Sequence, residues 1–170
     1  MASLMDELLL TMDGERSLYE KLISLNGEKK DSIIHKKLEV LEQVTVQEQA
    51  IADSLLKLEE KRAKLLRSIA TVMGHDGEQV TVSWMISNLA NQPVEQGKLR
   101  DAKEKLVKVA DDVQVLNFQT QNLLKQAIEM VEFDITLIKS VKQAPQTSNY
   151  GRDAETTGDL LGNRGFDAKQ

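Results

Sequence analysis

Hydrophobic residues recur at alternating spacings of three and four along the segment from Leu99 to Val141. The members of this repeat are Leu99, Ala102, Leu106, Val109, Val113, Leu116, Thr120, Leu123, Ala127, Met130, Asp134, Leu137 and Val141. All but Thr120 and Asp134 are apolar, and no glycine or proline interrupts the stretch from Lys98 to Ala144. A repeat of this period keeps one side of a helix against partner helices along its whole length. The pattern therefore predicts a long helix over residues 94–143.

Two more long helices are predicted, over residues 3–34 and 37–73. Gly27 weakens the first of them, but we expect the helix to continue because the apolar spacing resumes beyond it. The second is followed directly by Gly74, a residue suited to the left-handed position that ends a helix. Its apolar repeat is broken by Glu48 and Arg62, and charged breaks of this kind usually set the register between helices.

A short helix is predicted over residues 81–90, between the second and the last long helix. Thr81 is suited to cap it, and Pro93 is well placed in the first turn of the helix that follows. The chain is therefore expected to be all-α. We predict an elongated antiparallel bundle of three long helices plus a short connecting helix, forming one helical domain over residues 1–144.

The last helix carries a second apolar stripe beside its main repeat. Its members are Leu124, Ile128, Val131, Ile135 and Ile138, whereas the equivalent positions nearer the start of this helix are largely polar. This stripe either packs on the first helix or remains as an exposed groove for a partner helix. On the second interpretation, the candidate partner-binding residues are Leu116, Leu123, Leu124, Ile128, Val131, Ile135 and Ile138.

Residues 145–170 differ in character from the helical part. Glycines and small polar residues dominate, so this segment buries too little apolar surface to offset the entropy of ordering, and we expect a flexible tail. It contains a Tyr-Gly element at Tyr150 and a Phe-Asp-Ala-Lys element at 166–169. Short aromatic and charged elements are a common form of docking motif, although composition alone favours isolated aromatics in a spacer.

Composition and charge limit the classes of function that the sequence allows. The net charge is −5, and the basic residues are dispersed rather than clustered. We therefore expect neither nucleic-acid binding nor membrane insertion. An amphipathic helix that lies on a membrane surface is a weaker alternative. The sequence lacks cysteine and an apolar run that could span a membrane, which predicts a cytoplasmic protein. The spacing of His35 and His75 fits no metal site, and no phosphate-binding or nucleophile motif occurs. We expect no metal, no cofactor and no enzymatic activity.

Several segments resemble the FlgN-type flagellar export chaperones. They are Leu58-Glu59-Glu60-Lys61-Arg62, Val80-Thr81-Val82-Ser83, Phe133-Asp134-Ile135-Thr136-Leu137, Tyr150-Gly151-Arg152-Asp153-Ala154-Glu155-Thr156 and Phe166-Asp167-Ala168-Lys169. The resemblance extends over nearly the whole chain, and its more specific part is the Tyr-Gly element after a long helix together with the Phe-Asp-Ala-Lys terminus.

The resemblance implies a cytosolic chaperone of flagellar type III export. Such a protein binds the disordered termini of hook-associated proteins, which form the hook–filament junction, prevents their premature assembly and delivers them to the export gate. The resemblance also associates the long last helix with client capture. It associates the tail tyrosine, here Tyr150, with docking on the export gate. The alternative from the heptads alone is a self-assembling coiled-coil scaffold, and a homo-oligomer is compatible with either function.

Overall fold

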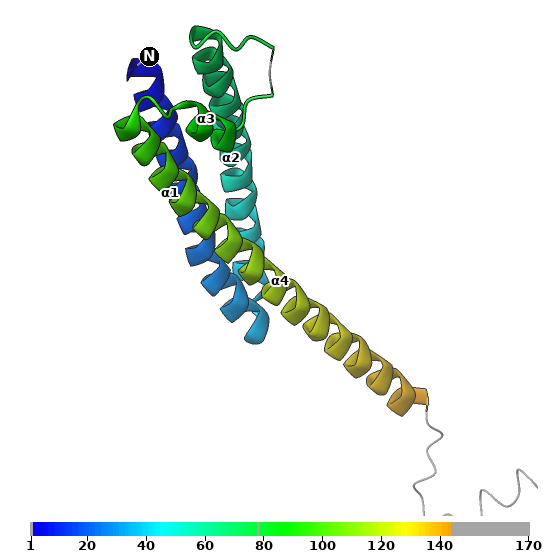
Figure 1. Ribbon diagram of the computed structural model, residues 1–170. Coiled ribbons are helices and arrows are strands. Elements are labelled where there is room, and N and C mark those ends of the chain that lie inside the picture. Colours follow the sequence, from blue (N-terminus) through cyan, green and yellow to red (C-terminus); the bar gives the residue numbers. More distant parts are fainter. Residues whose placement is uncertain (1, 78, 144–170) are drawn as a thin grey trace, which may run out of the picture. The chain divides into compact units, whose positions relative to one another are not determined.

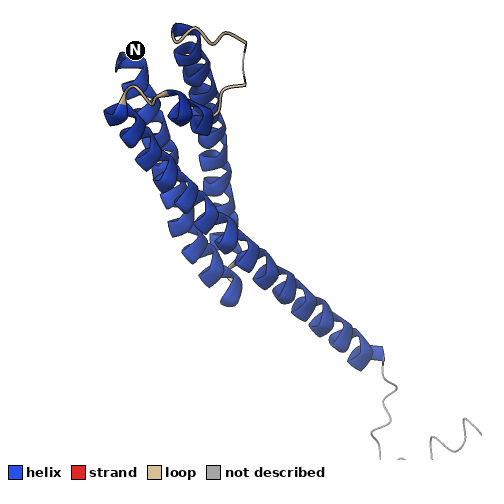
Figure 2. Cartoon of the chain, viewed as in Figure 1, coloured by secondary structure: helices blue, strands red, loops and turns tan. Residues whose placement is uncertain are grey.

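The computed structural model describes residues 2–77 and 79–143, and these ranges contain four helices and no strand (Figure 2). The helices are α1 (Ala2–Ile34), α2 (Leu38–Val72), α3 (Val82–Asn88) and α4 (Pro93–Gln143) (Figure 1). The predicted all-α class is therefore confirmed for the described ranges. The chain divides into two compact units, Met1–Ala127 and Ile128–Gln170, with the division inside α4.

Helix α1 continues through Gly27 and ends in a turn that contains a lysine with a positive φ angle. Lys36 has φ 54°, the N–H of Lys37 donates to the carbonyl oxygen of Ser32 at 2.8 Å, and that of Lys36 donates to Ile33 at 3.3 Å. These two bonds form a Schellman arrangement, which satisfies carbonyl groups that the end of a helix would otherwise leave unpaired. The chain then enters α2 directly, so the first two helices form a tight helical hairpin.

The end of α2 has the same arrangement with the residue predicted from the sequence. Gly74 has φ 84°, and the N–H of His75 donates to the carbonyl oxygen of Ala70 at 2.9 Å. The Thr81 hydroxyl accepts a hydrogen bond from the N–H of Trp84 at 3.1 Å, which confirms the predicted cap of α3. Pro93 is the first residue of α4, where its missing N–H leaves no helical bond unmade.

The core of the unit Met1–Ala127 is built from all four helices. Its buried members are Met5, Leu8, Met12, Leu65, Leu66, Ile69, Val82, Met85, Leu89, Leu99 and Leu106. Leu8, Met85 and Leu99 are completely inaccessible to solvent and come from α1, α3 and α4. Because α3 contributes buried residues to this core, it is an integral part of the unit.

Paired residues show how the helices of this unit run. Along α1, Glu7 and Lys29 pair with Lys61 and Glu48 of α2, at 2.9 Å in each case, so the two helices are antiparallel. Helix α4 advances in the same direction as α1, since Asn26 lies opposite Thr120 and Met12 lines a cavity with Ala102. The part of α4 in this unit therefore runs parallel to α1 and lies beside it.

The charged breaks in the α2 repeat lie at the contact with α1. Glu48 pairs with Lys29, and both side chains are about one-fifth exposed. The Nε atom of Arg62 lies 3.2 Å from Oε1 of Glu15 on α1. Such partly covered pairs oppose slippage of one helix along the other, because a shift would leave each charge without its partner.

Candidate partner-binding surface

The predicted partner-binding residues are divided between the two units of the chain. Leu116, Leu123 and Leu124 belong to the unit Met1–Ala127 and are partly buried. The other four, Ile128, Val131, Ile135 and Ile138, belong to the unit Ile128–Gln170 and have exposed fractions between 44% and 55%. The second stripe is therefore open to solvent along the four positions from Ile128 onwards.

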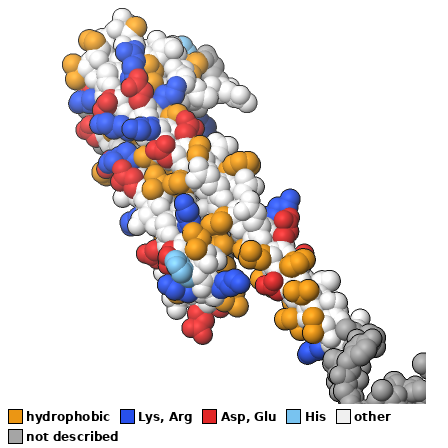
Figure 3. Space-filling view, turned by 90° about the horizontal axis from the view of Figure 1, so that it is seen from below, with side chains coloured by type: hydrophobic (Ala, Val, Ile, Leu, Met, Phe, Trp, Pro, Cys, Tyr) orange, Lys and Arg blue, Asp and Glu red, His pale blue; other side chains and the backbone are white. Residues whose placement is uncertain are grey.

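Four further large hydrophobic side chains are exposed on the same segment. Together the eight form what we call the exposed apolar face of α4: Ile128, Met130, Val131, Phe133, Ile135, Leu137, Ile138 and Val141. Their exposed fractions lie between 44% and 68%. Figure 3 shows hydrophobic side chains gathered along the last turns of this helix. Contiguous apolar surface of this kind on a polar background marks interaction sites.

The exposed apolar face consists of two stripes with a charged residue between them. At 100° per residue, Ile128, Val131, Ile135 and Ile138 form one stripe, and Met130, Phe133, Leu137 and Val141 form the other. Asp134 lies between the stripes. The apolar side takes up roughly 220° of the circumference, about twice the width that a surface helix normally needs to pack on a core. It has room for a partner on more than one side.

The main heptad repeat of α4 changes its environment at the boundary between the units. Leu99, Leu106, Val113 and Thr120, spaced seven residues apart, are buried, whereas Met130, Asp134, Leu137 and Val141 are exposed. The prediction that this repeat lies against partner helices along its whole length is therefore wrong beyond Ala127. The reason is helix length. Asn26 lies opposite Thr120 and α1 ends at Ile34, about two turns later, whereas α4 continues to Gln143.

Half of the exposed apolar face was missed by the sequence-based prediction. Met130, Leu137 and Val141 were assigned to the buried repeat, and Phe133 entered only through the family resemblance. A usable signal was present in the predicted lengths, because residues 3–34 and 37–73 are too few to cover a helix over 94–143. Comparing the lengths of the predicted helices would have indicated the exposed residues.

A buried polar contact joins α1 and α4 within the unit Met1–Ala127. The hydroxyl oxygen of Thr120 lies 2.7 Å from Oδ1 of Asn26 and 2.9 Å from the carbonyl oxygen of Leu116, and both side chains are at most 5% exposed. Burying an amide group is costly unless it has a hydrogen-bond partner, so the side chain of Asn26 is held opposite the Thr120 hydroxyl. The contact therefore fixes the register of α4 on α1.

The side chain of Glu15 is almost completely covered, at 3% exposed, in the contact between α1 and α2. Burial raises the pKa of this carboxyl group above its usual 4.5, against the opposing effect of the Arg62 charge and with a further increase from Glu59. Its Oε2 atom has no hydrogen-bond partner in the described part of the chain. The group lies within the core of a helix pair rather than in a cleft.

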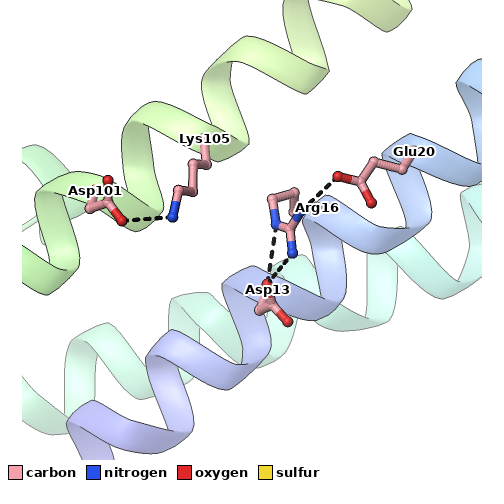
Figure 4. Close-up of polar contacts among 5 residues, drawn as sticks. All are labelled: Asp13, Arg16, Glu20, Asp101 and Lys105. Atoms are coloured by element: carbon pink, nitrogen blue, oxygen red, sulfur yellow. Dashed lines mark hydrogen bonds and ion pairs between the residues drawn. The ribbon is translucent and has the colours of Figure 1, made fainter.

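Several further charged contacts lie on the surface within single helices. Arg16 contacts Asp13 at 2.7 Å and Glu20 at 2.6 Å on α1, and Lys105 contacts Asp101 at 2.8 Å on α4 (Figure 4). Exposed pairs at this helical spacing contribute little to stability. Residues 2–77 and 79–143 contain no cluster of His, Cys, Asp or Glu that could hold a metal ion.

Comparison with known proteins identifies the family. The family model for FlgN protein matches residues 1–158. The chain belongs to the FlgN family. No curated protein and no solved structure matches it. Membership in the FlgN family confirms the resemblance found in the sequence and indicates a flagellar export chaperone. The family is one of chaperones and is not known as a family of enzymes.

The FlgN match includes the segments that carried the resemblance, except the last. Residues 58–62 lie on α2, residues 133–137 lie within the exposed apolar face of α4, and residues 80–83 lead into α3. Tyr150 is within the matched range but outside the described residues. The whole of the predicted tail over 145–170 also lies outside the described residues. The Phe-Asp-Ala-Lys element lies beyond both. In the part of this FlgN-family chain that the structure describes, none of the helices has the length and apolar character needed to cross a membrane.

Proposed function

We propose that this FlgN-family protein is a cytoplasmic export chaperone that binds the disordered termini of hook-associated proteins through the exposed apolar face of α4. The observation that supports the proposal is the run of eight large hydrophobic side chains, all at least 44% exposed, between Ile128 and Val141. A segment that folds as an amphipathic helix on such a face buries its own apolar side at the same time. A client bound in this way cannot assemble with other copies through that segment.

The size of the face fits reversible binding. Covering five of its side chains with matching ones removes on the order of 1,000 Å² from water, which contributes about 25 kcal/mol. Ordering ~15 residues of a disordered partner costs roughly 15–20 kcal/mol. The difference corresponds to about micromolar affinity. A carrier that must later release its client needs an affinity of this order.

The proposal is tested by isothermal titration calorimetry with peptides from the C-terminal ends of hook-associated proteins. Replacing Ile135 by Asp places a charge within the exposed apolar face and should weaken binding at least about tenfold. Circular dichroism should show unchanged helicity, since Ile135 is 47% exposed. Val115→Asp is the matched control, because Val115 lies on the same helix, is 55% exposed and belongs to neither stripe.

Absence of binding by the parent protein, or equal losses in the Ile135 and Val115 variants, would contradict the proposal. Self-assembly through the same face is the competing function. Analytical ultracentrifugation separates the two, because a scaffold would remain an oligomer on dilution, whereas a chaperone with a free face would not.

Delivery of the client is the second part of the proposal. We assign docking on the export gate to Tyr150, on the strength of the family resemblance of the Tyr-Gly element. Tyr150→Ala should leave client binding unchanged in calorimetry and block secretion of hook-associated proteins by cells. Normal secretion and motility in such a strain would remove the docking role.

A further inference from the structure

Asp134 is the acidic residue that interrupts the exposed apolar face of α4. Its helical neighbours three and four positions away are Met130, Val131, Leu137 and Ile138, with exposed fractions of 60%, 44%, 51% and 55%. Side chains at these spacings surround one another on a helix surface. The carboxylate therefore stands among four large hydrophobic side chains that are open to solvent.

The surroundings of Asp134 provide it with no counter-charge. Because all four of these helical neighbours are apolar, the carboxylate forms no ion pair with them, and none with any other described residue of the chain. The nearest cations along α4 are Lys139, five positions away, and Lys142, eight positions away. In the unbound protein, water solvates this charge.

A partner that covers the four hydrophobic neighbours must also cover Asp134. Removing water from a carboxylate is costly unless a cation or several hydrogen-bond donors replace it. We propose that Asp134 selects the partner: the segment bound on this face is an amphipathic helix with a Lys or Arg inside its apolar side, opposite Asp134. The inference rests on the proposed function and adds the chemistry of the client. Arg is the better match, because its guanidinium group donates two parallel hydrogen bonds to a carboxylate.

Charge complementarity favours a basic partner segment over a second copy of this helix. The first half of the exposed segment contains only acidic charged residues, Glu129, Glu132 and Asp134. Of these, only Asp134 lies within the apolar face, so a second copy aligned in parallel would place Asp134 against Asp134, and like charges placed together at an interface oppose association. A segment with a central cation meets no such opposition.

The test uses three synthetic amphipathic peptides of about 20 residues that differ at one central position of the apolar side, which is Arg, Leu or Glu. Each is titrated into the full-length protein by calorimetry. The Arg peptide should bind at least about tenfold more tightly than the Leu peptide, and the Glu peptide should bind most weakly. Asp134→Lys should reverse the order of the Arg and Glu peptides, and Asp134→Leu should bind the Leu peptide more tightly than the parent does.

Two controls separate a local effect from general attraction to an acidic protein. Glu129→Lys changes a charge on the polar side of the same helix and should leave the order of the peptides unchanged. Asp134→Asn keeps the shape and removes the charge, so it should reduce the difference between the Arg and Leu peptides. Rising salt concentration should weaken binding of the Arg peptide more than binding of the Leu peptide.

Equal or tighter binding of the Leu peptide by the parent, an unchanged order in Asp134→Lys, or no binding of any peptide would overturn the inference. A dimer of the parent alone that Asp134→Lys dissociates would also overturn it and assign the face to a second copy. If hook-associated termini bind but the peptides show no order, only this inference fails. If the order is present but those termini do not bind, the proposed client fails while the required chemistry stands.

Discussion

Glu15 has a carboxylate that the fold encloses without fully satisfying it. Its side chain is 3% exposed, the Nε atom of Arg62 lies 3.2 Å from Oε1, and Oε2 has no hydrogen-bond partner among the described residues. Loss of water outweighs the attraction of Arg62, and the pKa of Glu15 is raised as a result. Burial of Glu15 therefore makes the stability of the helix pair sensitive to pH.

The raised pKa of Glu15 determines the direction in which the free energy of unfolding changes with pH. The folded protein holds the Glu15 proton more strongly than the unfolded chain does, so the stabilisation is complete below the usual value of 4.5 and is lost as the pH rises through the folded value. Relative to Glu15→Gln, the parent should lose free energy of unfolding between pH 4 and pH 7. Urea unfolding at both pH values measures this difference. Glu104→Gln, an exposed position on α4, is the control, and a parent that gains relative to Glu15→Gln would contradict the sign.

Local chemistry made some single residues predictable and others not. Gly74 and Thr81 were predicted from the sequence because glycine tolerates a positive φ angle and threonine accepts a hydrogen bond from a helix N-terminus. Lys36 takes the left-handed position after α1, although lysine has no preference for it. The tight connection to α2 imposes this conformation, so tertiary context overrides the local preference.

The contact between Asn26 and Thr120 joins two helices far apart in the sequence. Thr120→Val removes the hydroxyl group and leaves the buried amide of Asn26 without this partner, which should cost about 1–3 kcal/mol of stability. Denaturant unfolding measures the loss, and adding Asn26→Leu should recover part of it. Thr136→Val is the matched control, since the exposed Thr136 hydroxyl bonds, among the described residues, only to the Glu132 carbonyl. Equal effects at Thr120 and Thr136 would show that the contact with α1 adds nothing.

Helix periodicity predicted the elements but not which of their faces are covered. The heptad spacing that buries Leu99, Leu106 and Val113 is the same spacing that leaves Leu137 and Val141 exposed. A repeat reports that a stripe is apolar and says nothing about the presence of a partner. That depends on where the neighbouring helices end, which the ends of α1 at Ile34 and α4 at Gln143 show.

At the scale of the whole molecule, the buried core and the proposed binding surface belong to different parts of the chain. Every buried residue of the core lies within the unit Met1–Ala127, whereas the described residues from Ile128 to Gln143 are all exposed. The exposed stretch therefore contributes little to the hydrophobic stability of the fold. Substitutions there are free to change what the protein binds.

Ending the chain after Ala127 tests this separation. The shortened protein should unfold cooperatively, with a free energy of unfolding within about 1 kcal/mol of that of the full chain. It should no longer bind client peptides in calorimetry. Leu99→Ala in the full chain is the contrasting control, since Leu99 is fully buried and its truncation should cost about 2–5 kcal/mol. A shortened chain that loses its cooperative transition would show that residues beyond Ala127 support the core.

The lone tryptophan gives the two units different optical signatures. Trp84 lies in α3, in edge-to-face contact with His75 at 5.1 Å between ring centroids. Its fluorescence therefore reports the melting of the unit Met1–Ala127, whereas far-ultraviolet ellipticity also includes the turns after Ile128. A fall in ellipticity at temperatures where the indole emission is still constant would record the fraying of the exposed end of α4 without any label.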